Sequence, residues 1–493
     1  MIDGLKPYPA YKDSGVPWLG QVPVHWDVRR LRDSTEGCIA GIWGNEPNGL
    51  NDLPCVRVAD FDRQRLRVRL TKPTMRSVAM NERRRRMLVR GDLLLEKSGG
   101  GDQQPVGVVM LYDHDIPAVC SNFVARVPVS AAFDSGYLAY LHSHLYAIRL
   151  NLRSIKQTTG IQNLDSSAYL SEPAAFPPLR EQSAIVRFLD HTDRRIRRYI
   201  RAKKKLIALL NEQKQAIIHR AVTRGLGPND HLKPSGVEWL GEVPKHWEIK
   251  RLRNLTANVT SGSRGWSNYA ADSGPLFIRI GNLTRASIEL DLSDTVRLNL
   301  PTSVLGETTR TRVAPDDVLL SITAFIGSVA IVPSDIGEAY VSQHVACCRL
   351  APGAANARWV GYVLLSPIGK IHGTLCMYGG TKQGLSLDDV RNHVVLLPPR
   401  EEQDALVQRI EADTAVIDVA SRATQREIDF VREYRTRLIA DVVTGKLDVR
   451  EAVARLPEEA EEPELLDEGE AMGEDEAEDE GGDLDALPEE AVA

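Results

Sequence analysis

The stretch YKDSGVPWLGQVPVHWDVRRLRD, residues 11–33, occurs in this chain a second time. It returns as LKPSGVEWLGEVPKHWEIKRLRN, residues 232–254, with both tryptophans and the histidine in register. A second pair of segments, FPPLREQSAIVRFLD at 176–190 and LLPPREEQDALVQRIE at 396–411, aligns its Pro-Pro pair with the same offset along the chain. A repeat of this length is half a protein rather than a solenoid unit. The sequence therefore predicts a pseudo-dimer within one chain.

The charge of the chain is divided unevenly. The formal net charge is −6, but residues 457–493 contain 18 Asp and Glu and no Lys or Arg, so residues 1–456 carry +12 (−6 + 18). A basic body favours the binding of a polyanion. Two interpretations of the acidic tail remain open: a solvating, unstructured segment, or a DNA mimic that competes for the basic body.

Length and cysteine usage bound the class of protein. A chain of 493 residues has room for about three domains, and each half is long enough to form its own core. The six cysteines show neither a CxxC pair nor zinc spacing with a histidine, which favours free thiols in a reducing cytosol. No apolar run approaches the ~18 residues of a membrane span, and no signal-peptide segment opens the chain. We therefore expect a soluble, cytoplasmic protein without a metal site.

Each half contains short apolar runs separated by turn-rich clusters. GDLLLEKSG and PVGVVMLY in the first half, and DDVLLSITAF and GSVAIVP in the second, have the length of strands. Clusters of Gly, Asp, Asn and Pro lie between such runs, as in α/β or α+β domains. We predict a mixed α+β fold in each half.

A heptad stripe follows each Pro-Pro pair. Its apolar residues succeed one another mainly at steps of three and four, the spacing of a coiled-coil seam. Each helix would have some 40 residues and a length of roughly 60 Å. Two such stripes bury each other most simply in an antiparallel coiled coil; the alternative is that each stripe packs on its own globular domain. The predicted helix-pairing residues are Val186, Leu189, Ile196, Ile200, Ile207, Leu210 and Ile217 in the first helix, and Val407, Ile410, Ile417, Ile428, Val431, Leu438 and Val442 in the second.

Catalytic motifs are not recognisable in this sequence. It has no GxxxxGK[ST], no GxGxxG after a strand, no HExxH and no Asn/Asp-Pro-Pro-Tyr of the kind found in adenine methyltransferases. His25 and His246 occupy identical places in the two copies, with no acid or nucleophile patterned beside them, which favours structural packing over catalysis. We predict no catalytic residue, metal ligand or cofactor in this chain.

Arginine and amide side chains are the candidates for DNA contacts. Arginine binds phosphate and pairs with guanine through two hydrogen bonds, and amide or hydroxyl groups contact base edges or phosphates. Charge runs of this kind usually only face solvent, so each residue is a weak candidate by itself. The candidates are Arg57, Arg63, Arg83, Arg84, Arg85, Lys97, Lys156, Gln157, Thr158 and Gln162 in the first half, and Arg264, Arg279, Arg285, Lys382 and Gln383 in the second.

The duplicated motifs resemble those of a known family. Trp-Leu-Gly-x-Val-Pro-x-His-Trp at 18–26 and 239–247, the two Pro-Pro segments with their following Glu-Gln, and the paired helices make the chain similar to specificity subunits of type I restriction–modification systems. The resemblance covers residues from about 10 to 450. One departure is that Leu179 follows the first Pro-Pro pair where Arg400 follows the second, and this leaves the helix register unchanged.

The resemblance implies a non-catalytic subunit that binds double-stranded DNA. Two target recognition domains would each read one half of a bipartite, asymmetric DNA sequence. The two helices would set the spacing and dock two methyltransferase subunits, and the restriction–translocase subunits would join through these. S-adenosylmethionine and ATP with Mg²⁺ would belong to the partners. The expected division is recognition domain 1 at 1–175, central helix 176–225, linker 226–235, recognition domain 2 at 236–396, distal helix 397–448 and disordered acidic tail 449–493.

Two other classes of protein fit the sequence less well. A stand-alone, pseudo-dimeric DNA-binding regulator explains the basic body and the repeat, but it does not need long exposed helices for partners. A nuclease or methyltransferase lacks its motifs.

Overall fold

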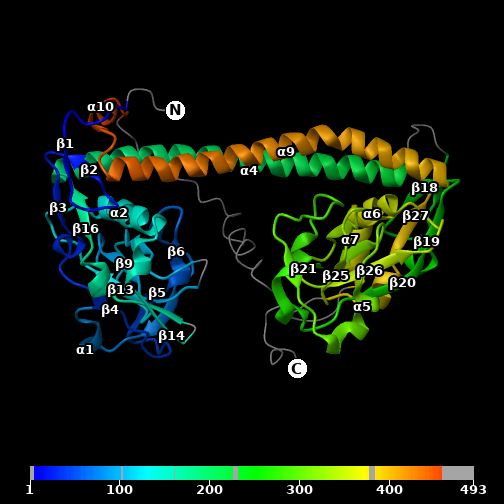
Figure 1. The fold of residues 1–493 in the computed structure, drawn as a ribbon, viewed down its shortest axis with the longest axis horizontal. Coiled ribbons are helices and arrows are strands. Elements are labelled where there is room, and N and C mark those ends of the chain that lie inside the picture. Colours follow the sequence, from blue (N-terminus) through cyan, green and yellow to red (C-terminus); the bar gives the residue numbers. More distant parts are fainter. Residues whose placement is uncertain (1–4, 102–103, 160, 226–230, 377–383, 458–493) are drawn as a thin grey trace. The chain divides into compact units, whose positions relative to one another are not determined.

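The described residues form two compact units, and each unit draws on both long helices. The computed structural model describes residues 5–101, 104–159, 161–225, 231–376 and 384–457. The first unit consists of the described residues up to Ala202 together with those from Arg426 onward, and the second consists of the described residues of Lys203–Gln425. Figure 1 shows the elements with their labels.

The first unit is a mixed α and β structure. Its helices are α1 (Met80–Arg83), α2 (Ser135–Ala147), α3 (Ser166–Tyr169) and α10 (Arg450–Ala454). Its strands are β1 (Tyr11–Asp13), β2 (Gln21–Pro23), β3 (Asp27–Arg30), β4 (Ile39–Ala40), β5 (Asp52–Val56), β6 (Phe61–Asp62), β7 (Arg67–Val68), β8 (Thr74–Ser77), β9 (Leu93–Glu96), β10 (Ser98–Gly99), β11 (Val109–Leu111), β12 (Val119–Cys120), β13 (Val124–Val127), β14 (Ile155–Thr159), β15 (Ile161–Leu164) and β16 (Pro173–Phe176).

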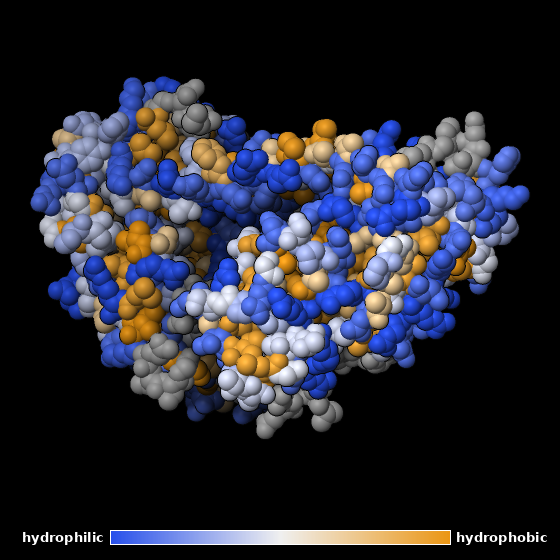
Figure 2. All heavy atoms as spheres, turned by 45° about the vertical axis from the view of Figure 1, so that its right-hand side comes forward, coloured by the Kyte–Doolittle hydropathy of each residue, from blue (hydrophilic) through white to orange (hydrophobic). Residues whose placement is uncertain are grey.

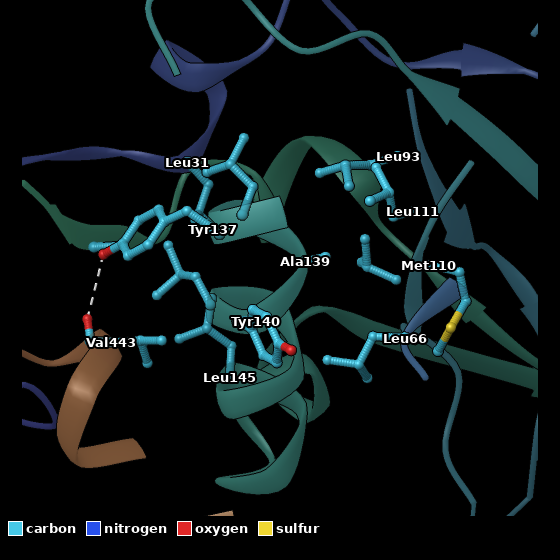
Figure 3. Close-up of a cluster of buried hydrophobic side chains, with 14 of the residues drawn as sticks. Leu31, Leu66, Leu93, Met110, Leu111, Tyr137, Ala139, Tyr140, Leu145 and Val443 are labelled. Carbon is cyan, nitrogen blue, oxygen red and sulfur yellow. Dashed lines mark hydrogen bonds between the residues drawn. The ribbon is translucent and has the colours of Figure 1, made fainter. Parts of the chain in front are cut away.

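The core of the first unit lies between α2 and a mixed sheet. That sheet has the strand order β4-β13-β9-β11-β7-β6. Two smaller sheets of the same unit have the orders β12-β5-β8 and β10-β15-β14. Leu93 and Leu111 of the sheet and Tyr137 of α2 belong to one buried cluster (Figure 3). The Tyr137 hydroxyl donates to the carbonyl of Val443, 3.3 Å away, in the last turn of a long helix. The far end of the chain therefore completes the core of the N-terminal unit.

The second unit repeats this plan with other lengths. Its helices are α5 (Leu305–Thr311), α6 (Ala357–Leu365), α7 (Pro367–Cys376) and α8 (Leu387–Arg391). Its strands are β17 (Leu232–Pro234), β18 (Glu242–Pro244), β19 (Glu248–Arg251), β20 (Thr256–Ser261), β21 (Ala270–Ile278), β22 (Val296–Leu298), β23 (Val318–Ser321), β24 (Val329–Ile331), β25 (Ala339–Val341), β26 (Val345–Leu350) and β27 (Val394–Leu397). The two larger sheets have the orders β20-β26-β23-β24 and β22-β21-β25.

The duplicated sequence forms the same structure in both units. β1 pairs with β2 as β17 pairs with β18, and β3 pairs with β16 as β19 pairs with β27, all antiparallel. Each second strand of these last pairs runs directly into a Pro-Pro pair. The internal repeat of the sequence is thus an internal repeat of the fold.

Two long helices follow the Pro-Pro pairs. α4 (Leu179–Arg224) has 46 residues and α9 (Arg400–Val443) has 44. Proline is tolerated at a helix start because the first N–H groups of a helix have no intrahelical partner, and both helices begin directly after their prolines. Figure 1 shows α4 and α9 side by side, and the contacts within each unit agree with that. The predicted fold class, with two similar mixed domains and two long antiparallel helices, is confirmed.

One boundary of the predicted division needs correction. The sequence predicts a disordered tail at 449–493, but Val449 is fully buried and α10 follows it. The Asp448 N–H donates to the carbonyl of Lys6 at 2.8 Å, which ties this segment to the start of the chain. The folded part of the chain therefore continues to residue 457, and residues 458–493 lie outside the described residues.

Candidate nucleic-acid interface

A glutamate at the start of α4 holds the duplicated tryptophan motif of the first unit. The Glu181 carboxylate accepts hydrogen bonds from the Tyr8 hydroxyl at 2.6 Å and from Trp26 Nε1 at 2.9 Å, and it contacts His25 Nε2 at 2.8 Å. The Trp26 side chain is fully buried. Burial and the adjacent Glu181 raise the pKa of Tyr8 well above its usual value, so this hydroxyl remains a neutral donor. A carboxylate in the first turn also stabilises the helix, because it lies at the positive end of the helix dipole.

The second unit has the same junction with fewer partners. The Glu402 carboxylate contacts His246 Nε2 at 2.8 Å and accepts from Trp247 Nε1 at 3.1 Å. The Glu402 side chain is 20% exposed, compared with 6% for Glu181. Both histidines therefore bind a helix-start carboxylate, which agrees with the structural role that the sequence favoured. The sequence did not identify these carboxylates as hydrogen-bond acceptors for the histidines and tryptophans.

The glutamine after each of these glutamates joins the helix start to the domain. Gln182 Nε2 donates to the carbonyl of Pro177, and its Oε1 accepts from the backbone N–H of Asp134, both at 2.8 Å. Gln403 makes the equivalent bonds with Pro398 and Asn356, again at 2.8 Å. These buried amides fix the direction in which each helix leaves its domain, because both hydrogen-bonding ends of the side chain are committed.

Polar side chains pair the helices within the first unit. Asp193, 7% exposed, forms ion pairs with Arg197 on its own helix and with Arg435 on α9. The Tyr199 hydroxyl donates to the Glu427 carboxylate at 2.9 Å. A buried charge is stable only with a partner, so Asp193 selects one register of α4 against α9.

In the second unit a buried lysine forms the ion pair between the two long helices. Lys214 Nζ donates to the Asp418 carboxylate at 2.6 Å, and the lysine side chain is 6% exposed. None of the predicted helix-pairing residues is exposed. Those that are buried are Leu189, Ile196, Val407, Ile410, Ile417, Ile428, Leu438 and Val442, and those that are half-buried are Val186, Ile200, Ile207, Leu210, Ile217 and Val431. Leu189, Leu438 and Val442 belong to the core of the first unit and Val407 and Ile410 to that of the second, so these residues also pack on the globular domains.

The arginines predicted to bind DNA in the first unit lie on several elements. Arg84 and Arg85 follow α1 and are exposed. Arg83 Nη2 donates to Asn51 Oδ1 at 2.7 Å. Arg57 contacts the carboxylate of Asp60 at 3.3 Å, and Arg63 Nη1 donates to Gln104 Oε1 at 2.5 Å. In Figure 1 α1 and β14 are both at the end of this unit remote from α4 and α9.

The hairpin of β14 and β15 contains a further group of these candidates. Lys156 is exposed and pairs with Asp165 at 2.8 Å, and Lys97, half-buried, precedes β10 of the same sheet. Gln162 is only 6% exposed, and its Oε1 accepts from the Val106 N–H at 3.2 Å. The Gln162 side chain therefore stabilises the adjoining loop and is not available at the surface, contrary to the prediction. The side chains of Gln157 and Thr158 lie outside the described part of the structure.

The second unit has fewer basic candidates. Arg264 and Arg285 are exposed, and the Arg285 guanidinium lies over the Phe325 ring at 5.6 Å. Arg279 occupies the place of Arg57: each is the N-cap of a short 3-10 helix, and each backbone N–H donates to a side chain three residues later. Lys382 and Gln383 lie outside the described residues. Figure 2 shows one face on which hydrophilic side chains predominate and hydrophobic ones stand in small groups.

Among the described residues, all six cysteines are free thiols and no His, Cys, Asp and Glu cluster has the arrangement of a metal site. None of the described helices combines the length and apolar character that a membrane crossing requires.

Comparison with known proteins supports a specificity-subunit fold. No family model matches the chain. It is 22% identical over 438 residues to the putative type I restriction enzyme MjaX specificity subunit of Methanocaldococcus jannaschii, a match that covers 88% of this chain and 96% of that protein. It is 23% identical over 341 residues to the EcoBI specificity subunit of Escherichia coli, which covers 67% of this chain and 70% of the relative.

A solved structure has the same fold. The structure concerns complex assembly and conformational transition of the type I R-M system, and one of its chains matches with a TM-score of 0.56 and 16% identity, over 86% of this chain and 98% of that one. The duplicated junctions and the paired helices agree with this similarity. The chain is thus similar in sequence to specificity subunits of type I restriction enzymes.

Proposed function

We propose that this chain is the non-catalytic DNA-specificity subunit of a type I restriction–modification complex. Each recognition domain, with the extents 1–175 and 236–396, reads one half of a bipartite, asymmetric target. α4 and α9 set the spacing of the half-sites and dock two methyltransferase subunits, through which restriction–translocase subunits join. Methyl transfer, ATP hydrolysis and cleavage belong to these partners.

The observation that carries the proposal is a repeated junction attached to unlike domains. Glu181 and Glu402 bind the same motif in both units, so the two domains meet their helices in the same way. The surfaces differ: when the first residues of α1 and α5 are aligned, Arg83–Arg86 in the first unit correspond to Thr308–Thr311 in the second, of which only Arg310 is basic. Arginine and threonine offer different hydrogen-bonding groups, so the two half-sites differ in sequence.

The helix seam supports the spacing function. Asp193 with Arg435 in the first unit and Lys214 with Asp418 in the second each fix one register of α4 against α9. A slip of either helix would leave a buried charge without its partner. A register fixed in this way gives one spacer length rather than several.

Methylation sequencing of the host with and without this gene tests the proposal. We expect one bipartite adenine-methylated motif that disappears with the gene. Replacing residues 30–175 with those of a relative changes one half of that motif and leaves the other half and the spacer unchanged. A motif that survives deletion, or a swap that alters both halves, contradicts the proposal.

The alternative is a stand-alone DNA-binding regulator. Tight, sequence-specific binding by the purified chain, together with purification free of a methyltransferase, favours that alternative.

A further inference from the structure

Each unit places an exposed apolar residue at the same point of its fold. Met80 is the first residue of α1 and is 72% exposed, and Leu305 is the first residue of α5 and is 49% exposed. The same interval of chain separates Met80 from the start of β9 at Leu93 and Leu305 from the start of β23 at Val318. Single exposed apolar residues are common on proteins, but the same place in two divergent domains is a more specific observation.

An aspartate just before each strand confirms this alignment. The Asp92 carboxylate accepts from the N–H of Val89 at 2.7 Å and from Arg126 Nε at 2.6 Å. Asp317 accepts from the N–H of Ala314 at 2.7 Å and from Arg349 Nε at 2.8 Å. Because the two buried aspartates match in these partners, Met80 and Leu305 are equivalent residues.

Neither residue stabilises the free chain where it stands. The N-cap residues before them, Ala79 and Val304, make no side-chain capping bond, although Ser, Thr, Asp or Asn there stabilises a helix by about 1 kcal/mol. Met80 is 72% exposed and Leu305 49%, so each gains only part of the burial energy that a core position would give. At the same place in both units, the residues present are therefore not the most stable local choice. Such positions are typical of functional surfaces.

Arginine lies near both residues, and in the second unit Arg310 also pairs with Glu307 at 3.9 Å. Arg84 and Arg85 lie one turn after Met80 and are exposed, and Arg83 is held by Asn51. In the second unit, Arg310 Nη2 donates to Ser263 Oγ at 3.0 Å. Leu50, next to Asn51 and 85% exposed, enlarges the apolar surface of the first unit. Guanidinium groups bind phosphates, while exposed Met and Leu are among the side chains that pack against or between bases.

We propose that Met80 and Leu305 are equivalent apolar contacts to DNA, one in each recognition domain, which pack on bases or sugars while the neighbouring arginines hold the phosphates. This inference rests on the proposed function. It adds a pair of specificity-determining residues, and it assigns each residue to one half-site.

Salt dependence separates an apolar contact from a phosphate contact. Replacing a phosphate-bound arginine removes the release of about one counterion, whereas an apolar contact releases none. The complex of this chain with its methyltransferase subunits is titrated, at several salt concentrations, with a 40-base-pair duplex that carries the site found by methylation sequencing. The variants are Met80→Ala, Leu305→Ala and Arg84→Ala. Ile116→Ala serves as the control, because Ile116 is 48% exposed but adjoins Asp113 and Asp115.

We expect Met80→Ala and Leu305→Ala each to weaken binding about tenfold with an unchanged salt slope. Arg84→Ala lowers the slope by about one, and Ile116→Ala binds like the wild type. Duplexes with one half-site scrambled show which half-site each residue contacts. When the first half-site is already scrambled, Met80→Ala should lower the affinity no further. Wild-type affinity in both alanine variants overturns this inference alone. A wild-type complex that does not prefer its site over a scrambled duplex overturns the proposed function as well.

Discussion

The two helix-start glutamates provide a matched pair of substitutions, Glu181→Ala and Glu402→Ala. Glu181 has three polar partners, and the substitution leaves the fully buried Trp26 N–H and the nearly buried Tyr8 hydroxyl without an acceptor. A buried group left unsatisfied costs about 1–3 kcal/mol, so we expect a loss of about 3–5 kcal/mol in the first unit. Glu402 has two partners, and one of them, His246, is 46% exposed. The second unit should lose only about 1–2 kcal/mol.

Hydrogen exchange measured by mass spectrometry is the suitable assay, because a chain with two units does not unfold in a single two-state step. A free-energy change of about 1.4 kcal/mol corresponds to a tenfold change in an opening equilibrium. Glu181→Ala should therefore speed exchange in β1–β2 by about a hundredfold or more, and Glu402→Ala should speed exchange in β17–β18 by about tenfold. The isosteric variant Glu181→Gln should fall between Glu181→Ala and the wild type, since its carbonyl still accepts from Trp26. Equal effects at the two junctions, or a larger effect at Glu402, would refute this account of the hydrogen bonds.

Three further predictions concern the seam, a buried histidine and the tail. Ile196→Asp and Ile417→Asp place a charge in the buried seam, so we expect loss of assembly with methyltransferase subunits on gel filtration; intact complexes would count against the seam. Burial lowers the pKa of His142 to about 4, below the 6.5 of an unfolded histidine. Between these values only the unfolded state takes up the proton, so the stability of the first unit falls by about 3 kcal/mol as pH drops from 6.5 to 4. Hydrogen exchange in α2, corrected for the intrinsic rate, should therefore show a weaker pH dependence in His142→Gln. Deleting residues 458–493 removes 18 negative charges, so DNA affinity at low salt should rise; an unchanged affinity would exclude competition by the tail.

The helices and the repeat could be predicted from sequence because their signals are local or are copied. The heptad stripe needs only the spacing of residues such as Ile196 and Ile417 along one segment, and both are buried. The partner of Trp26 could not be predicted, because Glu181 is 155 residues away in the chain. The sequence contains no pattern that joins an indole N–H to a particular carboxylate.

The surface residues were harder to predict for a different reason. Gln162 has the polarity of a DNA-contacting residue, but its side-chain oxygen accepts from the backbone N–H of Val106, 56 residues earlier in the chain. Met80 and Leu305 were not among the candidates, since polarity alone does not select exposed apolar residues. Aligning the two halves beyond the duplicated motifs, from the aspartates before β9 and β23, would have revealed the pair.

The contribution of α9 to the first core bears on the order in which the units form during synthesis. Leu438, Val442 and Val449 belong to the cluster that contains Trp26. The second unit is contiguous, whereas the first lacks its final segment until the ribosome has added the 224 positions from Ala202 to Arg426 (426 − 202). At about 5–20 residues per second this interval lasts roughly 10–45 s. The N-terminal unit, although translated first, is therefore the last to be completed, and it exposes part of its apolar interior to chaperones in the meantime.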